Sequence, residues 1–485
     1  MTRWLSVMLL AALAATAAAA TSVHVPVSTR IPAAQAAFDR GLFFYYAYNR
    51  EESASAFADS AADDPSLAMA LWGEALANGP DLNTPMLADA FARAQAANSH
   101  ARQLLASASA ATPMERTLIA AQALRFRGSF ADWTADDAAY RSTMLREASA
   151  SNDETVQLLA AEALMESDQT DARARTLVDE VLARDPTNPM ANHLCLHLAD
   201  EARDRAFAEI CAQRLDAADF PPPAEHLAHV PAHYWIETGN YAKALSSSER
   251  AYALLVQLEN SGRDPAHVEQ YAKHDVGVGY SAAMMLGNYA TAQRWSDRMA
   301  PAFDYRFGGI TALRFARYDV AYAVPSNEMG ATVVRGFAAL LLGKNAEAAT
   351  IGKAVERQTE ASPNDGYLAQ IFLARLAEAQ GRDADALRWF ERAEANQHDA
   401  FGAELIPWMP AGEALGGFYL RRGIDDRAVN AFEDDLSTYP NDPRALLGLS
   451  LALERLGRTA DADRAHQAFQ RAWAGADTTL TPADL

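Results

Sequence analysis

A short motif constrains the fold of this chain more than any other feature: a glycine followed three and five residues later by alanine. It occurs at residues 239–244, 287–292, 343–348, 381–386 and 457–462, and a sixth copy at 423–428 has Asp426 at the first alanine position. Apolar residues at spacings of three and four flank each copy, which is typical of helices. Glycine permits the turn that ends one helix, and the small alanine lets the next helix lie close to it. The motif therefore predicts a series of helix-turn-helix hairpins.

The period of the C-terminal copies is that of a tetratricopeptide repeat. Gly423 and Gly457 are 34 residues apart, the period expected for this repeat. The repeat's small, aromatic and proline positions are filled by Gly416, Tyr419, Ala428, Phe432 and Pro440, and the same spacing recurs at Gly41, Phe44, Phe57 and Pro65. The other turn glycines lie 38 to 56 residues apart, which predicts stretched or degenerate repeats in the middle of the chain.

These observations predict an all-α fold, a continuous α-solenoid of tetratricopeptide-like hairpins over residues 31–475. The most regular repeats are expected at 366–475, after an extended lead at 21–30 and before a polar tail at 476–485. Residues 1–20 are typical of a secretory signal peptide, with Arg3, an apolar run and a small-residue cleavage site at Ala18 and Ala20. We therefore expect an exported protein, periplasmic or secreted, with no membrane span in its mature chain.

Charge and cysteine content narrow the class of protein. The 42 Lys and Arg residues face 63 Asp and Glu residues, a net charge of -21 that disfavours a nucleic-acid partner. The two cysteines are too few for a disulfide scaffold or a four-cysteine zinc module. They lie equally far from residue 203, which is in a polar segment where we expect the turn of one hairpin. Cys195 and Cys211 are therefore predicted either to form a disulfide or to pack as two buried thiols.

Histidines are concentrated in one part of the chain. Of the eleven, seven lie between His193 and His274. In a tetratricopeptide repeat, the second, fifth, ninth and twelfth residues of the first helix line the concave groove. Counted from the turns, the histidines of three successive first helices occupy such positions, which predicts a His-rich groove at 190–285. Its expected ligand-binding residues are His193, His197, Asp200, His226, His229, His233, Glu237 and His274.

Neutral imidazole is the commonest protein ligand for zinc, copper and nickel. We therefore predict that a divalent transition metal (Zn, Cu or Ni) binds in the groove, with His193, His197, His229 and His233 as its ligands. Two other interpretations stay open: a site for an anionic or aromatic ligand, and polar residues satisfied between packed helices. Pro231 lies within the predicted helix and would shift His226 and His229 relative to His233 if it caused a kink or a late start.

The spaced histidine blocks resemble a family of bacterial tetratricopeptide-repeat proteins that carry a histidine signature. His193-Leu-Cys-Leu-His197 with Asp200 resembles its paired-His block, and His226-x-x-His229-Val-Pro-Ala-His233 resembles its His-Met-Pro-Ser-His block. His274-Asp275 resembles its His-Asn-x-His block, although Asp275 replaces the Asn and Gly277 replaces the second His. The resemblance covers nearly the whole mature chain. It implies an all-helical repeat protein with a shared His site and implies no particular activity.

Together these features predict an exported scaffold that binds a protein, a peptide or a small ligand in a groove with a His-rich, metal-binding site. The alternative is a metal-assisted enzyme, a hydrolase or an oxidoreductase, that uses the same histidines. We favour the binding protein over the enzyme. A bound metal with an open coordination position would favour the enzyme.

Overall fold

The computed structural model describes residues 23–108, 110–202, 205–260, 265–303, 306–325, 329–361, 366–401, 406–481 and 484–485. Within these ranges, side chains are described except at 200–202, 205, 265–273, 300–303, 306, 329, 359–361 and 398–401. The predicted signal peptide at 1–20 lies outside the described residues. So does the start of the predicted lead, residues 21–22.

The described part of the chain is built from 24 α-helices and one 3₁₀ turn, without a β-strand. The first twelve helices are α1 Pro32–Tyr46, α2 Arg50–Asp63, α3 Ala68–Ala77, α4 Ala88–Ser107, α5 Pro113–Arg125, α6 Trp133–Ser149, α7 Glu154–Met165, α8 Ala172–Arg184, α9 Pro189–Ala202, α10 Arg205–Ala217, α11 Glu225–Glu237 and α12 Tyr241–Glu259. The other twelve are α13 Pro265–Met285, α14 Tyr289–Phe303, α15 Arg306–Arg314, α16 Tyr318–Tyr322, α17 Met329–Leu341, α18 Asn345–Ala361, α19 Tyr367–Ala379, α20 Asp383–Phe401, α21 Ala411–Arg421, α22 Asp425–Thr438, α23 Pro443–Arg455 and α24 Thr459–Ala472. The 3₁₀ turn, at Phe130–Asp132, precedes α6.

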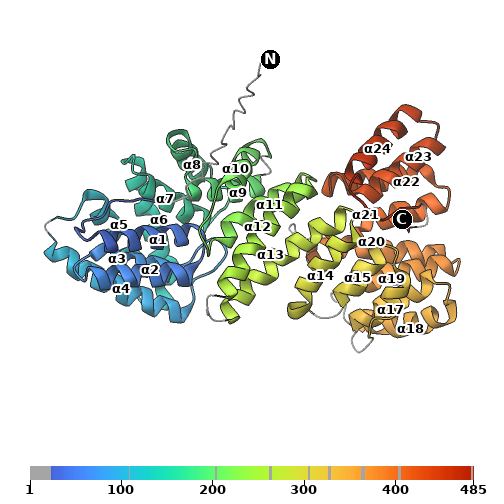
Figure 1. Ribbon diagram of the computed structural model, residues 1–485, viewed down its shortest axis with the longest axis horizontal. Coiled ribbons are helices and arrows are strands. Elements are labelled where there is room, and N and C mark those ends of the chain that lie inside the picture. Colours follow the sequence, from blue (N-terminus) through green and yellow to red (C-terminus); the bar gives the residue numbers. More distant parts are fainter. Residues whose placement is uncertain are drawn as a thin grey trace, which may run out of the picture.

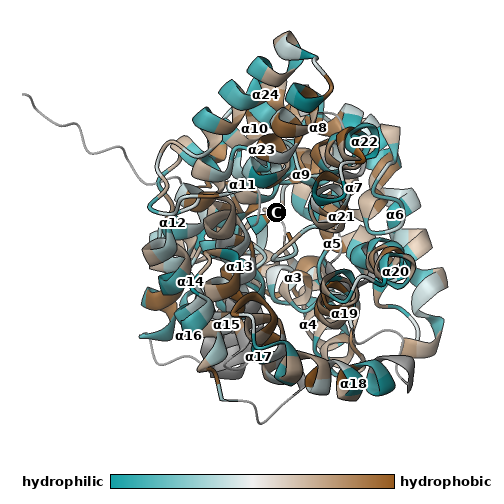
Figure 2. Cartoon of the chain, turned by 90° about the vertical axis from the view of Figure 1, so that its right-hand side faces the viewer, coloured by the Kyte–Doolittle hydropathy of each residue, from teal (hydrophilic) through white to brown (hydrophobic). Residues whose placement is uncertain are grey.

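Successive helices pack as hairpins, and the hairpins stack into an α-solenoid (Figure 1). Seen from one end of the solenoid, helices lie on all sides of the centre of the view (Figure 2). The predicted fold class, an all-α solenoid of tetratricopeptide-like repeats, is therefore confirmed. No helix in the described part of the chain has the length and the apolar character that a membrane crossing requires.

The turn glycines have the backbone conformation that the motif predicts. All six have φ between 68° and 74°, as measured at Gly239, Gly287, Gly343, Gly381, Gly423 and Gly457. A side chain disfavours this left-handed region, so glycine suits these turns. Two further turns have the same shape without glycine, at Tyr48 and Ala316, where φ is 55°. In both of these turns, as in the turn at Gly239, the residue after the left-handed one donates its backbone N–H to a carbonyl of the first helix: Asn49 to Phe44, Arg317 to Ala312, and Asn240 to Trp235.

Small residues inside the helices allow close helix packing. A Cβ atom added to Gly41 would approach the ring of Phe57 to 2.7 Å, and one added to Gly416 would approach the ring of Phe432 to 2.5 Å. Both pairs belong to the predicted small and aromatic repeat positions. The two phenylalanines are fully buried, so the repeat pattern describes core packing at both ends of the chain.

The N-terminal hairpin contacts helices that follow it by more than 100 residues. Helix α1 packs against α9, and the Nδ2 atom of Asn49 donates a hydrogen bond of 2.7 Å to Oε1 of Glu225, at the start of α11. These contacts place the α1–α2 turn beside α9 and α11.

The lead and the tail both pack on the solenoid. Residues 23–30 have no regular secondary structure, and the backbone N–H of Ser28 donates to Glu115 Oε1 at 2.7 Å. At the other end Leu485 is buried, and its carbonyl oxygen accepts a hydrogen bond of 2.5 Å from Arg375. Tyr318 donates to Asp484 at 2.9 Å. The predicted polar tail is thus held against the C-terminal repeats where it is described.

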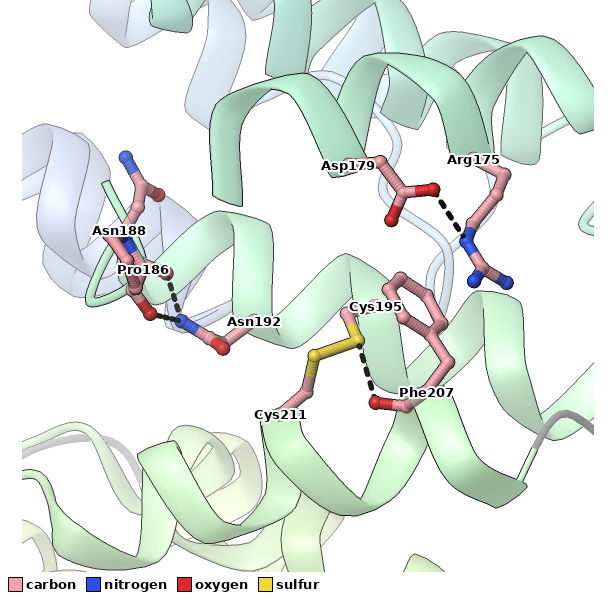
Figure 3. Close-up of a disulfide and its surroundings, with 8 residues drawn as sticks. All are labelled: Arg175, Asp179, Pro186, Asn188, Asn192, Cys195, Phe207 and Cys211. Carbon is pink, nitrogen blue, oxygen red and sulfur yellow. Dashed lines mark hydrogen bonds and ion pairs between the residues drawn. A yellow bond between two sulfur atoms is a disulfide. The ribbon is translucent and has the colours of Figure 1, made fainter. Parts of the chain in front are cut away.

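Cys195 on α9 and Cys211 on α10 are joined by a disulfide inside one hairpin (Figure 3). Their Cα atoms are 6.4 Å apart. This separation is within the range of about 4.4–6.8 Å that a disulfide requires. Of the two interpretations left open by the sequence, the structure contains the bridge.

Candidate metal centre

Three helices, each the first of a hairpin, carry the histidines predicted for the groove. Helix α9 carries His193 and His197, α11 carries His226, His229 and His233, and α13 carries His274. Helix α9 packs against α11, and α11 packs against α13 (Figure 1). The spacings of three and four residues on α11 place its histidines along one face of the helix.

Pro231 does not interrupt α11. The helix runs from Glu225 to Glu237 with the proline inside it, so the late start that the sequence allowed does not occur. All three histidines of α11 therefore share one helical register.

The first group of converging rings consists of His193, His197 and His226. The Nε2 atom of His193 lies 3.1 Å from Nε2 of His226 and 3.1 Å from Nε2 of His197. On the opposite side of its ring, Nδ1 of His193 lies 2.9 Å from the carbonyl oxygen of Tyr46. A carbonyl only accepts hydrogen bonds, so Nδ1 carries the proton and Nε2 of a neutral His193 presents a lone pair to the other two rings.

The second group consists of His229, His233 and His274. Here His233 is central: its Nε2 atom lies 2.8 Å from Nε2 of His229 and 3.1 Å from Nε2 of His274. In each group the ligand atoms all lie within 4.8 Å of one another. Each group therefore offers three nitrogens to one point, the donor set of a three-histidine metal site.

The two groups are neighbours along α11. The ring centroids of His226 and His229, one from each group, are 6.2 Å apart. The four histidines predicted as one metal set are therefore divided two and two between the groups. His226 and His274, predicted only as groove residues, complete the two sets of three.

Of the two predicted carboxylates, the one whose side chain is described lies outside both groups. Glu237 is half-buried at the end of α11 and is outside the two histidine sets. The side chain of Asp200 lies outside the described residues, so its predicted role stays a prediction.

Burial favours the neutral form of four of the six histidines. It lowers the pKa of His193, His226, His229 and His233 well below the usual value, and neighbouring histidines lower the pKa further. A neutral imidazole has a free lone pair, which is the form that binds a metal ion. His197, His233 and His274 are half-buried, so solvent reaches both groups.

The sequence analysis missed Tyr48 as a residue of this site. Its buried ring lies beside the first group, with centroid distances of 4.4 Å to His193, 5.5 Å to His226 and 6.2 Å to His197. A signal for it exists in the sequence: Tyr48 follows Gly41 by seven residues, as the turn glycine Gly423 follows Gly416. Tyr48 thus takes the place of a turn glycine.

Two polar side chains approach the histidine groups. The amide nitrogen Nδ2 of Asn83 lies 3.4 Å from Nε2 of His226, beside the first group. Oδ1 of the buried Asp275 lies 3.5 Å from Nε2 of His229, beside the second. The sequence analysis identified Asp275 only as a departure from a family pattern and did not consider Asn83 part of the site.

No protein-family model matches this chain, and no curated protein matches it. Among solved structures, the heterotetramer of Cut9 and Hcn1 from APC/C is 11% identical, with a TM-score of 0.33 over 74% of this chain and 80% of that one. Yeast Tom70 is 12% identical, with a TM-score of 0.33 over 90% of this chain and 84% of that one. The tetratricopeptide-repeat domain of P58(IPK) is 12% identical, with a TM-score of 0.23 over 88% of this chain and 99% of that one.

Proposed function

We propose that this chain is a helical-repeat binding protein that holds divalent transition-metal ions in its two three-histidine groups. The observation that carries the proposal is the convergence of three Nε2 atoms in each group. Imidazole nitrogens suit zinc, copper and nickel, and three such ligands with one further position form a common zinc site.

Hydrogen bonds between neutral imidazole rings do not account well for these short distances between nitrogens. With its Nδ1 proton directed at the carbonyl of Tyr46, His193 has one lone pair at Nε2 and two other Nε2 atoms at 3.1 Å. One lone pair accepts one good hydrogen bond. A second proton on His193 would place a positive charge in a fully buried position, which burial disfavours. A metal ion accepts the lone pairs of all three rings at once.

Metal analysis of protein purified without an affinity His tag tests the proposal. We expect the wild-type chain to retain zinc at each of its two groups after dialysis. His193→Ala and His233→Ala each remove the central ring of one group. Each should weaken zinc binding at its site tenfold or more and so lower the zinc content by about one equivalent. His466→Ala is the control, because His466 is exposed on α24 and outside both groups. Wild-type protein without stoichiometric metal, or an equal loss in the control, would refute the proposal.

A metal-assisted enzyme is the second candidate function. It is favoured by the first group, which has three histidine ligands and no fourth metal-ligand side chain within the same reach among the described residues. Catalytic zinc sites keep such an open position for water or substrate. Azide added to the cobalt-loaded protein tests it: a change in the cobalt absorption bands, absent in His193→Ala, would indicate an open position.

We propose that the protein is exported, to the periplasm or outside the cell. The signal-like pattern of residues 1–20 supports this proposal, and the disulfide between Cys195 and Cys211 is of a kind that persists in oxidising compartments. Mass spectrometry of exported material should find a chain that begins near Thr21. An intact Met1 in most of that material would contradict cleavage.

The repeat architecture also supports a role as a scaffold, because stacked hairpins present an extended surface to a protein, a peptide or a small ligand. Cross-linking in a cell extract, followed by mass spectrometry of wild-type protein and of His193→Ala, would test whether a partner binds and whether its binding needs the metal.

A further inference from the structure

A carboxylate lies beside the second histidine group. Asp275 follows His274 on α13, and only 4% of its surface is exposed. Its Oδ1 atom lies 3.5 Å from Nε2 of His229, the atom that His229 directs at His233. Its other oxygen, Oδ2, has no hydrogen-bond partner among the described residues.

Among the described residues, the ion-pair contact of this carboxylate is with His229, at 3.5 Å, and not with a Lys or Arg. A buried carboxylate is stable in its charged form only when a positive group compensates it. A divalent ion held by the second group would be such a group.

The distances place Asp275 next to the three nitrogens of the second group. Zinc binds nitrogen and oxygen ligands at about 2.0–2.2 Å, so neighbouring ligand atoms of a tetrahedral site are about 3.3–3.5 Å apart. Around the second group, the separations are 2.8 Å and 3.1 Å between nitrogens and 3.5 Å from His229 to Asp275. The oxygens of Asp275 are outside the set of atoms that all lie within 4.8 Å of one another, so its side chain would have to move toward His233 and His274 to join the three nitrogens at one ion.

Among the described side chains, the ring of Tyr48 and the amide of Asn83 lie beside the first group. Its three imidazoles leave the full charge of a bound ion uncompensated, whereas an aspartate at the second group would neutralise one of the two positive charges.

We propose that Asp275 is the fourth protein ligand of the second site, so that the chain carries two chemically different metal sites, one with three histidines and one with three histidines and a carboxylate. This inference rests on the proposed metal-binding function. The anionic oxygen makes the second site the tighter one for a divalent ion such as zinc, and the first site keeps a position for an exogenous ligand.

Zinc titration of single-site variants tests the inference. His226→Ala leaves the second site, and adding Asp275→Asn should then weaken zinc binding tenfold or more. His233→Ala leaves the first site, and adding Asp275→Asn there should leave the zinc affinity unchanged. Asn is the matched substitution, because it keeps the shape of the side chain and removes its charge.

The outcomes separate this inference from the proposed function. Wild-type protein that binds no zinc would overturn both. Zinc binding that Asp275→Asn leaves unchanged in both backgrounds, or weakens equally in both, would overturn the role of Asp275 alone. If circular dichroism shows that the Asp275 variants are unfolded, the zinc-loaded wild-type structure decides. A carboxylate oxygen of Asp275 at about 2.0–2.2 Å from the ion supports the inference, and one beyond about 3 Å overturns it.

Discussion

The ring of Tyr48 stacks on the imidazole of His226, with ring centroids 5.5 Å apart and ring planes inclined by 19°. Tyr48 lies in a turn, and its φ there is 55°. Six other turns of the chain have glycine at the equivalent position. A non-glycine residue in this region costs on the order of 1–2 kcal/mol. The tyrosine therefore retains a strained backbone while its ring fills the space beside the first histidine group.

Two substitutions of Tyr48 separate the effect of its backbone strain from the effect of its ring on the first histidine group. Tyr48→Gly relieves the backbone but removes a buried ring that fixes His193 and His226, so we expect zinc affinity at the first site to fall about tenfold. Tyr48→Phe keeps the ring and should keep the affinity. Competition with a chromophoric chelator measures both.

Ala316→Gly is the matched control for this experiment. Ala316 has the same φ of 55° in a turn between α15 and α16, away from the histidines. The change should raise the free energy of unfolding by about 1 kcal/mol without altering zinc binding. Tyr48→Gly protein with wild-type affinity would show that the ring does not position the site.

Glu162 should make the stability of the chain depend on pH. It is buried on α7, accepts a hydrogen bond of 2.6 Å from Tyr45, and has its pKa raised to about 8 by burial and by Glu166. An unfolded glutamate has a pKa of about 4.3, so between this pH and about pH 8 the folded chain holds a proton on Glu162 that the unfolded chain has lost. The stabilisation that comes from this proton is present at low pH and is lost as the pH rises through about 8.

Glu162→Gln removes the titration and keeps an acceptor for Tyr45. The free energy of unfolding of the variant minus that of the wild type should therefore be larger at pH 9 than at pH 5, by on the order of 1–3 kcal/mol. Urea unfolding at both pH values measures the difference. A constant difference across this range would contradict a protonated Glu162 in the folded chain.

The disulfide should contribute to stability independently of the metal sites. Cys195 and Cys211 close a loop with a sequence separation of 16, worth about 3 kcal/mol in the chain-entropy model. The double variant Cys195→Ala and Cys211→Ala should unfold at correspondingly lower urea concentration and keep its zinc content. Thiol titration of denatured, unreduced wild-type protein should find no thiol, and two reactive thiols would exclude the bridge.

The sequence predicted the repeat architecture because one local rule, a left-handed turn that favours glycine, recurs at six positions. It also predicted which helices carry the histidines, because register within a hairpin follows from counting residues. It did not predict how six rings divide, since that depends on the spacing between α9, α11 and α13. The place of Tyr48 depends on α1 packing against α9, more than 100 residues away, and no local pattern contains that contact.

The central claim, that each group of three Nε2 atoms holds a metal ion, is tested most directly by anomalous diffraction from zinc-grown crystals of the tag-free protein. Data on the two sides of the zinc absorption edge should show two strong peaks. One should lie about 2.0–2.1 Å from Nε2 of His193, His197 and His226, and the other at the same distance from Nε2 of His229, His233 and His274. A map without a peak at either group, with the rings well ordered, would contradict the account.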